Sequence, residues 1–481
     1  MKAIKYLLAG ALMIGFSAQS MAQDIKSEVK AITKVIVDNK SNLDAVEDQI
    51  KAFYKANKKN PEALAGLGRA YFEVKDSVNA EKYANLAIKQ GKNNAAGYIL
   101  LGDICAYLQD DGGAAAGWYQ QAIHFDPQNP QGYIKYASIY RGRSPEEAVA
   151  KLEELRKIKP DYPVDAEAGH FFYLARKYDK AIEYYGKTAL QQLDDSQVRE
   201  FALAGYFSGN NAKSLEVSKY GNQTYPRDAV LNRMTFYNSL ALKDYPTAIE
   251  YADKLINASD SAKIIARDYT NYGHAYFGNK DYTNAIEMFK KSLALEESSD
   301  VHKLLSDTYS EMGDVANATA EYYTYLKGKA DASAKDYMSL ASIYTNAANK
   351  SEDVAVKNEN LAKADGIYKE IAEKFPSYLS YATYMRATIN SNMDPDFTKG
   401  LAKPYWEQLV EQVNSRETKT SNDTSYLKQA YYNLGAIAFT AENKELCDEY
   451  MRKLLEVDPD NATAKQMLGL DQPAEEGAAA E

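Results

Sequence analysis

Cysteine, histidine and tryptophan are scarce in this chain of 481 residues, which has two cysteines, two tryptophans and four histidines. The cysteines, Cys105 and Cys447, lie far apart in the sequence, and no histidine stands near them at the spacing of metal ligands. The sequence therefore predicts no metal site. It also has no Gly-rich phosphate loop, nucleophile elbow or HExxH motif, so we predict a protein that is not an enzyme and needs no cofactor.

Long apolar runs are absent after the first 22 residues, and no later window offers the roughly 18 apolar residues that a membrane span needs. The first 22 residues have the three parts of a secretory signal: Lys2 and Lys5, an apolar run from Tyr6 to Phe16, and the small-residue pattern ending at Ala22. The signal contains no cysteine for lipid attachment. We therefore expect export to the periplasm, the outer membrane or the medium, with residues 1–22 removed.

An excess of positive charge is also absent. The formal net charge is -10, and removing Lys2 and Lys5 makes it -12. A protein that binds nucleic acid needs a basic face to neutralise phosphates, so this balance argues against such a partner.

What the sequence has in quantity is internal repetition. A small residue recurs mostly every 33 to 38 positions, and four residues later a second column is mostly large, as in Tyr119, Tyr185 and Phe289. Positions four apart lie on one face of a helix, so the pattern predicts a repeated amphipathic helix. The small residues are Ala80, Ala115, Ala148, Ala181, Ser214, Ala248, Ala285, Ala318, Ala364, Ala402 and Cys447.

A second periodic helix precedes each small residue. Its pattern is clearest in Leu64-x-x-Leu67-Gly68-x-x-Tyr71 and returns in Tyr269-x-x-Tyr272-Gly273-x-x-Tyr276. A small residue at the centre of this helix lets a partner helix approach closely. Gly209-Asn210, Gly278-Asn279 and Gly313-Asp314 supply turns between the helices, and Ser144 to Glu147 reads as a capping box. Each unit is therefore a helix, a turn and a second helix.

These motifs resemble the tetratricopeptide repeat, a 34-residue helix-turn-helix unit. Residues 61–94, 266–298, 299–332 and 428–461 match best. The resemblance implies an all-α superhelix, or solenoid, of about eleven units. We expect capping helices at 23–60, about eight units at 61–332, and further units with insertions at 333–470. Leu401 to Tyr405 is similar to secreted tetratricopeptide proteins of Bacteroidetes.

Some segments depart from the repeat. Asn346 to Leu361 is an insertion that we expect to form a loop, and Pro404 predicts a late start or a kink in its helix. Residues 196–258 match only loosely. Residues 471–481 are acidic and rich in alanine, so we expect a disordered tail. In a solenoid, Cys105 and Cys447 would lie about nine repeats apart, too far for a disulfide, so we expect two buried, reduced thiols.

The resemblance also implies which side chains face the concave groove, namely those one and four positions after the central small residue of the first helix. Packing between repeats is the alternative interpretation for each of them. The positions are Arg69 and Phe72, Asp103 and Ala106, Ser138 and Arg141, His170 and Tyr173, Leu203 and Tyr206, Tyr237 and Leu240, His274 and Phe277, and Asp307 and Ser310.

Three functions fit this sequence. The first is a scaffold of the bacterial cell envelope that binds a protein or an extended peptide in the groove, with Tyr173, Tyr206, Tyr237 and Phe277 as aromatic anchors. The second is a glycan or small-ligand binding protein that uses the same aromatic groove. The third is an accessory subunit of an outer-membrane assembly. The sequence does not predict an oligomeric state.

Overall fold

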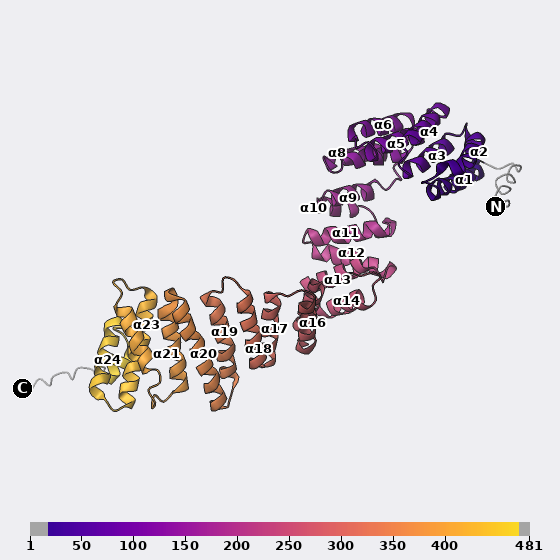
Figure 1. The fold of residues 1–481 in the computed structure, drawn as a ribbon. Coiled ribbons are helices and arrows are strands. Elements are labelled where there is room, and N and C mark those ends of the chain that lie inside the picture. The colour runs from indigo at the N-terminus through magenta and orange to yellow at the C-terminus, as the bar shows by residue number, and fades with distance from the viewer. Residues whose placement is uncertain (1–17, 471–481) are drawn as a thin grey trace, which may run out of the picture. The chain divides into compact units, whose positions relative to one another are not determined.

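A computed structural model describes residues 18–470, with side chains from Ile25 onward, and every regular element in that range is a helix. The predicted signal peptide and acidic tail thus lie at or beyond its edges: side chains of residues 1–24 and all of residues 471–481 are outside the described part. Consecutive helices pack as antiparallel pairs, and eleven such pairs lie between Pro61 and Val457 (Figure 1). The predicted all-α solenoid of helix-turn-helix units is confirmed.

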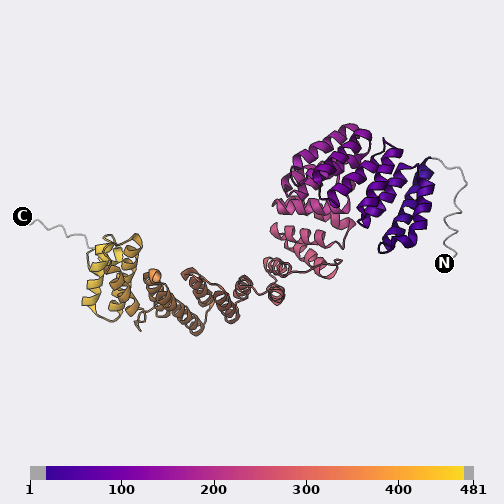
Figure 2. The ribbon, with the colours of Figure 1, turned by 45° about the horizontal axis from the view of Figure 1, so that its top comes forward.

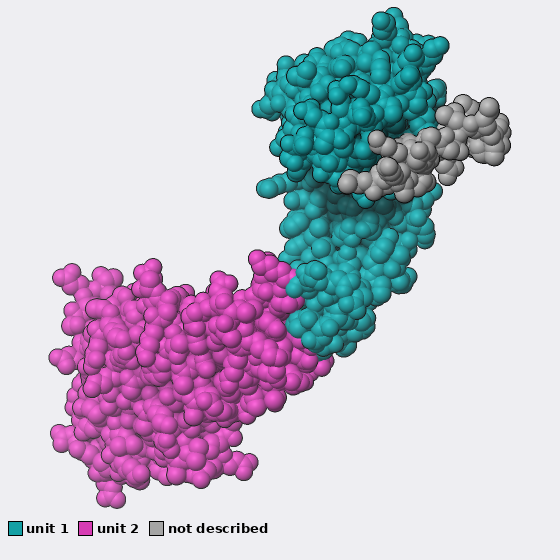
Figure 3. Space-filling view, turned by 45° about the vertical axis from the view of Figure 1, so that its right-hand side comes forward, with its two compact units in different colours: residues 1–262 teal, residues 263–481 magenta. Residues whose placement is uncertain are grey.

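The chain divides into two compact units, residues 1–262 and residues 263–481, which we call unit 1 and unit 2 (Figure 3). Unit 1 begins with α1 (Ala18–Asp38), η2 (Leu43–Val46) and α2 (Glu47–Asn57), in the segment where we expected capping helices. Six pairs follow in a curved stack (Figure 2). They are α3 (Pro61–Glu73) with α4 (Ser77–Gln90), α5 (Ala95–Tyr107) with α6 (Gly112–Phe125), α7 (Pro130–Tyr140) with α8 (Pro145–Ile158), α9 (Val164–Leu174) with α10 (Tyr178–Tyr185), α11 (Asp195–Phe207) with α12 (Asn211–Thr224), and α13 (Ala229–Ala241) with α14 (Tyr245–Asn257); η3 (Leu190–Gln192) precedes α11.

Unit 2 contains five pairs and a short final helix, and Figure 1 shows them side by side in sequence order. No helix in the described residues is both long and apolar enough to cross a lipid bilayer. The pairs are α15 (Ala266–Gly278) with α16 (Tyr282–Leu295), α17 (Ser299–Met312) with α18 (Val315–Gly328), α19 (Ala334–Lys350) with α20 (Val354–Lys374), α21 (Leu379–Met393) with α22 (Lys403–Asn414), and α23 (Ser421–Thr440) with α24 (Lys444–Val457); η4 (Pro376–Tyr378) precedes α21, and α25 (Ala462–Met467) ends the array.

The contact between the paired helices follows the two sequence columns. In the pair α5 and α6, a Cβ on Gly102 would lie 2.3 Å from Cε1 of Tyr119, so only glycine fits against that ring. Gly273 and Phe289 repeat the arrangement in α15 and α16, with a distance of 2.4 Å. The small residues of the second helices are buried in both units. The close approach that the sequence predicted is therefore the packing principle of both units.

Seven of the eleven turns within pairs have the same chemistry. A residue with positive φ comes first, and an Asp or Asn follows whose side chain accepts a hydrogen bond from the backbone of the second helix. Gly313 (φ 78°) and Asp314 form this turn as predicted. At the predicted Gly278-Asn279 turn, however, Lys280 has the positive φ (62°) and Asp281 is the cap, so the prediction was two residues early.

Two other expectations about helix ends need correction. Ser144 is the N-cap of α8, but its side chain makes no capping hydrogen bond, so the predicted capping box does not form. Asn346 to Leu361 is not a loop. Its residues lengthen α19 to 17 residues and α20 to 21, and only residues 351–353 connect them. Ala348 and Leu361 are buried between these helices, because the extra turns carry apolar residues at helical spacing. Pro404 lies in the first turn of α22, as its position predicted.

Both cysteines are buried free thiols, Cys105 in α5 and Cys447 in α24. Burial raises the pKa of each thiol, which keeps it protonated and unreactive.

Candidate functional site

In unit 1, Arg69 and Asp103 form an ion pair rather than a free recognition site. Asp103 is fully buried in α5 and accepts hydrogen bonds from Arg69 Nη2 of α3 at 2.5 Å and from the Tyr119 hydroxyl at 2.7 Å. Lys135 Nζ of α7 lies 3.0 Å from its other side. Three successive repeats are thus joined through one carboxylate. Asp103 does not offer its side chain to a ligand, contrary to our expectation, because every side of its carboxylate is occupied within the fold.

His170 joins neighbouring repeats in a similar way. Its Nδ1 atom lies 2.8 Å from Glu200 Oε2, and Tyr185 donates a hydrogen bond to the same oxygen at 2.6 Å. The hydrogen bond to Glu200 raises the pKa of His170 above its usual value of 6.5. Part of the imidazole ring remains accessible to solvent, although the ring connects α9 to α11.

The predicted aromatic anchors of unit 1 form one connected row. Ring centroids lie 6.1 Å apart for Tyr173 and Tyr178, 5.1 Å for Tyr178 and Phe207, 5.5 Å for Phe207 and Tyr206, and 6.1 Å for Tyr206 and Tyr237. Tyr173 and Tyr206 are half-buried, but Tyr237 is only 7% exposed. Tyr237 is therefore a packing residue, contrary to our expectation, because the ring of Phe236 and the side of Tyr206 cover it. The most exposed ring in the row is Phe207, at 53%.

Phe72 and Arg141 complete the predicted set in unit 1. Phe72 is half-buried, with the Arg69 guanidinium carbon 5.6 Å from the centre of its ring and Tyr107 at 6.4 Å. Arg141 is exposed at the end of α7. Phe72 thus packs at the end of its helix while Arg141 points into solvent.

In unit 2, His274 lines a cavity of about 500 Å³ between α15, α16 and α17. Thr270, Ser292 and Lys303 share this lining. Burial lowers the pKa of His274, so its ring is neutral at pH 7. Phe277 is not part of this lining. It packs edge-on against Tyr282, with ring centroids 5.6 Å apart.

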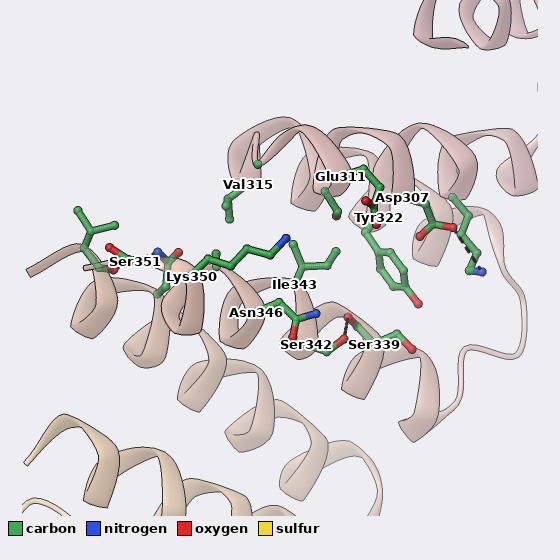
Figure 4. Close-up of a pocket in the computed structure, with 16 residues that line it drawn as sticks. Asp307, Glu311, Val315, Tyr322, Ser339, Ser342, Ile343, Asn346, Lys350 and Ser351 are labelled. Carbon is green, nitrogen blue, oxygen red and sulfur yellow. Dashed lines mark hydrogen bonds and ion pairs between the residues drawn. The ribbon is translucent and has the colours of Figure 1, made fainter. Parts of the chain in front are cut away.

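A second cavity in unit 2, of about 520 Å³, lies between α17, α18, α19 and α20 (Figure 4). Its volume is within the range of about 300–1,000 Å³ that is usual for ligand pockets. Asp307 and Ser310 of α17, both predicted groove positions, line one wall, and Ser342 and Asn346 of α19 line another. Lys303 of α17 lines both cavities, so the two adjoin at this helix.

Several side chains around this second cavity have hydrogen-bonding capacity that the fold does not use. Within the described residues, Ser310, Glu311, Asn346 and Lys350 make no side-chain hydrogen bond or ion pair. Burial raises the pKa of Asp307; nearby Glu311 adds to this rise, whereas Lys303 opposes it. Lys303 Nζ lies 3.8 Å from Asp307 Oδ2, beyond hydrogen-bonding distance. The cavity can therefore bind polar and charged groups, and its apolar members Val315, Ile343 and Val356 add contact area.

The sequence led to part of this cavity and missed the rest. Asp307 and Ser310 follow from the repeat pattern, but Ser342, Asn346 and Lys350 were not predicted. Their signal was present, because they recur every four residues along one face of α19 and begin directly after the central small residue Ala341. Asn346 and Lys350 were missed because residues 346–361 were expected to form a loop, and Ser342 because the groove positions were assigned only as far as Ser310.

Chemically, the described side chains are equipped for binding. Across residues 25–470, no group of three or more His, Cys, Asp or Glu side chains is arranged to hold a metal ion. What the two cavities of unit 2 offer is hydroxyl, amide, carboxylate and ammonium groups at an open surface.

Comparison with a family model identifies two of the helix pairs. The family model described as tetratricopeptide repeat matches residues 266–299 and 428–461, which contain α15 with α16 and α23 with α24. Similar solved structures include the C-terminal part of a tetratricopeptide repeat-containing protein from Cytophaga hutchinsonii, with 19% identity over 56% of this chain and 99% of that chain and a TM-score of 0.40. A tetratricopeptide repeat protein from Parabacteroides merdae has 20% identity over 52% and 98% and a TM-score of 0.32. MamA from Desulfovibrio magneticus has 19% identity over 40% and 92% and a TM-score of 0.28. Residues 266–299 and 428–461 thus match the tetratricopeptide repeat, and the remaining helix pairs of both units have the same all-α helix-turn-helix form.

Proposed function

We propose that this protein is a non-enzymatic scaffold of the bacterial cell envelope that binds a protein or an extended peptide along the first helices of its repeats. Repeat arrays of this kind expose a long inner surface because each repeat contacts only its neighbours. The match to the tetratricopeptide repeat supports this role, because proteins built from this repeat bind other proteins.

The observation that carries the proposal is the pair of adjoining cavities in unit 2. They lie at three positions that the repeat pattern assigned to the groove, His274, Asp307 and Ser310. In the second cavity, the side chains of Ser310, Glu311, Asn346 and Lys350 have no hydrogen bond or ion pair within the described residues, as a surface needs if it is to exchange water for another molecule. By contrast, Asp103 in unit 1 already has its partners, so unit 2 is the better candidate.

The cellular location is a separate part of the proposal. It rests on Lys2, Lys5 and the apolar run up to Phe16, which together have the pattern of a secretory signal. N-terminal sequencing of the protein recovered from its native cell envelope should begin at Gln23. An unprocessed N-terminus in the cytoplasm would contradict export.

Partner capture tests the scaffold role. Tagged wild-type protein recovered from the native envelope should carry a stoichiometric protein partner. Ser342→Arg fills the cavity with a long side chain and should abolish capture, whereas Thr324→Arg, on the exposed face of α18 outside the cavity lining, should not. Recovery of the wild type without any protein partner would contradict the proposal.

A second candidate function is glycan binding, which the hydroxyl groups of Ser310, Ser339 and Ser342 favour. Calorimetric titration with neutral oligosaccharides distinguishes it. Binding that Ser342→Arg abolishes would support the glycan, and no heat change would exclude the sugars tested.

A further inference from the structure

The second cavity of unit 2 exists because one helix pair is longer than its neighbour. The pair α17 and α18 has 14 residues in each helix, whereas α19 has 17 and α20 has 21. The extra turns bring Lys350, Ser351, Val356 and Asn360 to the cavity and form one of its ends. A repeat of the usual 34 residues would lack these turns, and this end of the cavity would have no wall.

One end of the cavity is negative. Asp307 and Glu311 are one turn apart on α17, and like charges at this spacing repel each other. Figure 4 shows both above the end of α19 that carries Ser339 and Ser342. Lys303 Nζ is 3.8 Å from Asp307, and Glu311 has no ion pair within the described residues. A cation placed between the two carboxylates would remove their repulsion.

In the part of the chain that the structure describes, the positive charge of the cavity that has no partner comes from Lys350. Lys350 is in the last turn of α19, and its side chain extends over that helix toward Ile343 (Figure 4). Its ammonium group makes no ion pair within the described residues. The cavity therefore carries charges of both signs, with two carboxylates on α17 and the ammonium group of Lys350 beside Ile343 of α19.

Along the cavity, α19 displays hydrogen-bonding side chains at a regular spacing. Ser342, Asn346 and Lys350 follow one another every four residues, or about 6 Å along a helix. Two residues of an extended peptide span about 6.6 Å. Alternate residues of an extended peptide would therefore meet successive turns of α19, with the Asn346 amide available to the peptide backbone.

We propose that this cavity binds an extended peptide that carries a lysine or arginine and, two to four residues away, an aspartate or glutamate. The inference rests on the peptide-binding function proposed above and specifies its ligand. The basic side chain lies against Asp307 and Glu311, and the acidic side chain pairs with Lys350. Val315 and Ile343 contact the aliphatic parts of the peptide.

Selection from a display library of random linear peptides on the immobilised full-length protein tests this ligand. The wild type should enrich peptides with the basic and acidic residues at that spacing. Asp307→Asn with Glu311→Gln should reduce enrichment of the basic residue at least tenfold and leave the acidic preference. Lys350→Gln should do the reverse. Matched controls are Glu373→Gln and Lys335→Gln, which remove exposed charges outside the cavity lining on α20 and α19.

The outcomes separate this inference from the scaffold role. Enriched peptides without the charge pattern, a pattern that survives the three cavity substitutions, or no enrichment by the wild type would each overturn the inference. In that case, the full-length protein can still capture an envelope partner, and Ser342→Arg can still abolish this capture. Such a result would support the scaffold role and contradict only the proposed peptide with one basic and one acidic residue. Circular dichroism of each variant should match the wild type, because all the substituted side chains are exposed.

Discussion

Tyr119 donates a hydrogen bond from its phenolic hydroxyl to Oδ1 of Asp103 at 2.7 Å, and both residues are buried in the same helix pair. The ring of Tyr119 fills the space that the missing side chain of Gly102 leaves open. Burial and this hydrogen bond raise the pKa of Tyr119. The large residue Tyr119 thus contributes its hydroxyl as well as its ring. The hydroxyl binds the carboxylate of Asp103, which joins three repeats.

Replacing Tyr119 with phenylalanine should therefore destabilise unit 1 while its packing is kept. Hydrogen bonds to charged groups contribute about 1.5–3 kcal/mol, and Asp103 would remain buried with one partner fewer. Chemical denaturation should show a loss of free energy of unfolding in this range. Tyr107→Phe removes a hydroxyl from a ring that is 62% exposed and should change stability little. Equal effects of the two substitutions would contradict the role of Asp103.

The pKa values of the two predicted groove histidines should be shifted in opposite directions from the usual value. The hydrogen bond to Glu200 raises the pKa of His170, whereas burial lowers the pKa of His274. NMR titration of the imidazole resonances, assigned with His170→Gln and His274→Gln, should therefore place His170 above about 6.5 and His274 below it. Coincident titration at the usual value would contradict both environments.

The sign of the stability change at His170 follows from its raised pKa. Protonated His170 is stabilised in the fold, so its contribution is fully present below about pH 6.5 and is lost as the pH rises through the higher pKa of the folded state. The difference in free energy of unfolding between the wild type and His170→Gln should shrink as the pH rises through that window. A difference that grows with pH would contradict the pairing with Glu200.

A buried polar interface connects α12 and α13, and here apolar replacement should be informative. Asn222 Nδ2 donates to Thr235 Oγ1 at 2.8 Å, and Thr235 donates to Ser218 Oγ at 2.9 Å. Thr235→Val keeps the shape but leaves buried polar groups without partners, at a cost of about 1–3 kcal/mol. The triple variant Asn222→Leu, Thr235→Val and Ser218→Ala should lose less free energy of unfolding than the single variant, because it leaves none of these three polar side chains buried without its partner. A triple variant that is less stable than Thr235→Val would contradict this account.

The lengthened helix α20 depends on its N-cap. Asp353 accepts hydrogen bonds from the backbone of Ala355 at 2.8 Å and of Val356 at 3.3 Å. Asp353→Ala should weaken the start of α20 by about 0.5–2 kcal/mol, and hydrogen exchange should become faster at residues 354–360. Asp331→Ala, which removes an exposed carboxylate from the turn before α19, should leave that exchange unchanged. Unchanged exchange in Asp353→Ala would show that the cavity wall is held by packing alone.

The repeat pattern predicted the helix pairs because it depends on local spacing, as the contact of Gly273 with Phe289 shows. It predicted groove positions less well, because the same face of a helix serves both packing and binding. Whether Asp103 is free or paired depends on Arg69 and Lys135, which come from neighbouring repeats. The length of α19 was missed because a polar stretch such as Asn346 to Lys350 favours a loop in sequence and becomes helical only when Ala348 and Leu361 pack together.

Site-specific photo-crosslinking tests the central claim most directly. A benzophenone amino acid at Ser342, inside the cavity, is compared with the same residue at Thr324, on the outer face of α18. In the native envelope, Ser342 should give a discrete crosslinked protein or peptide, and Thr324 should give none. Crosslinks at Thr324 alone, or at neither position, would contradict binding along the first helices of the repeats.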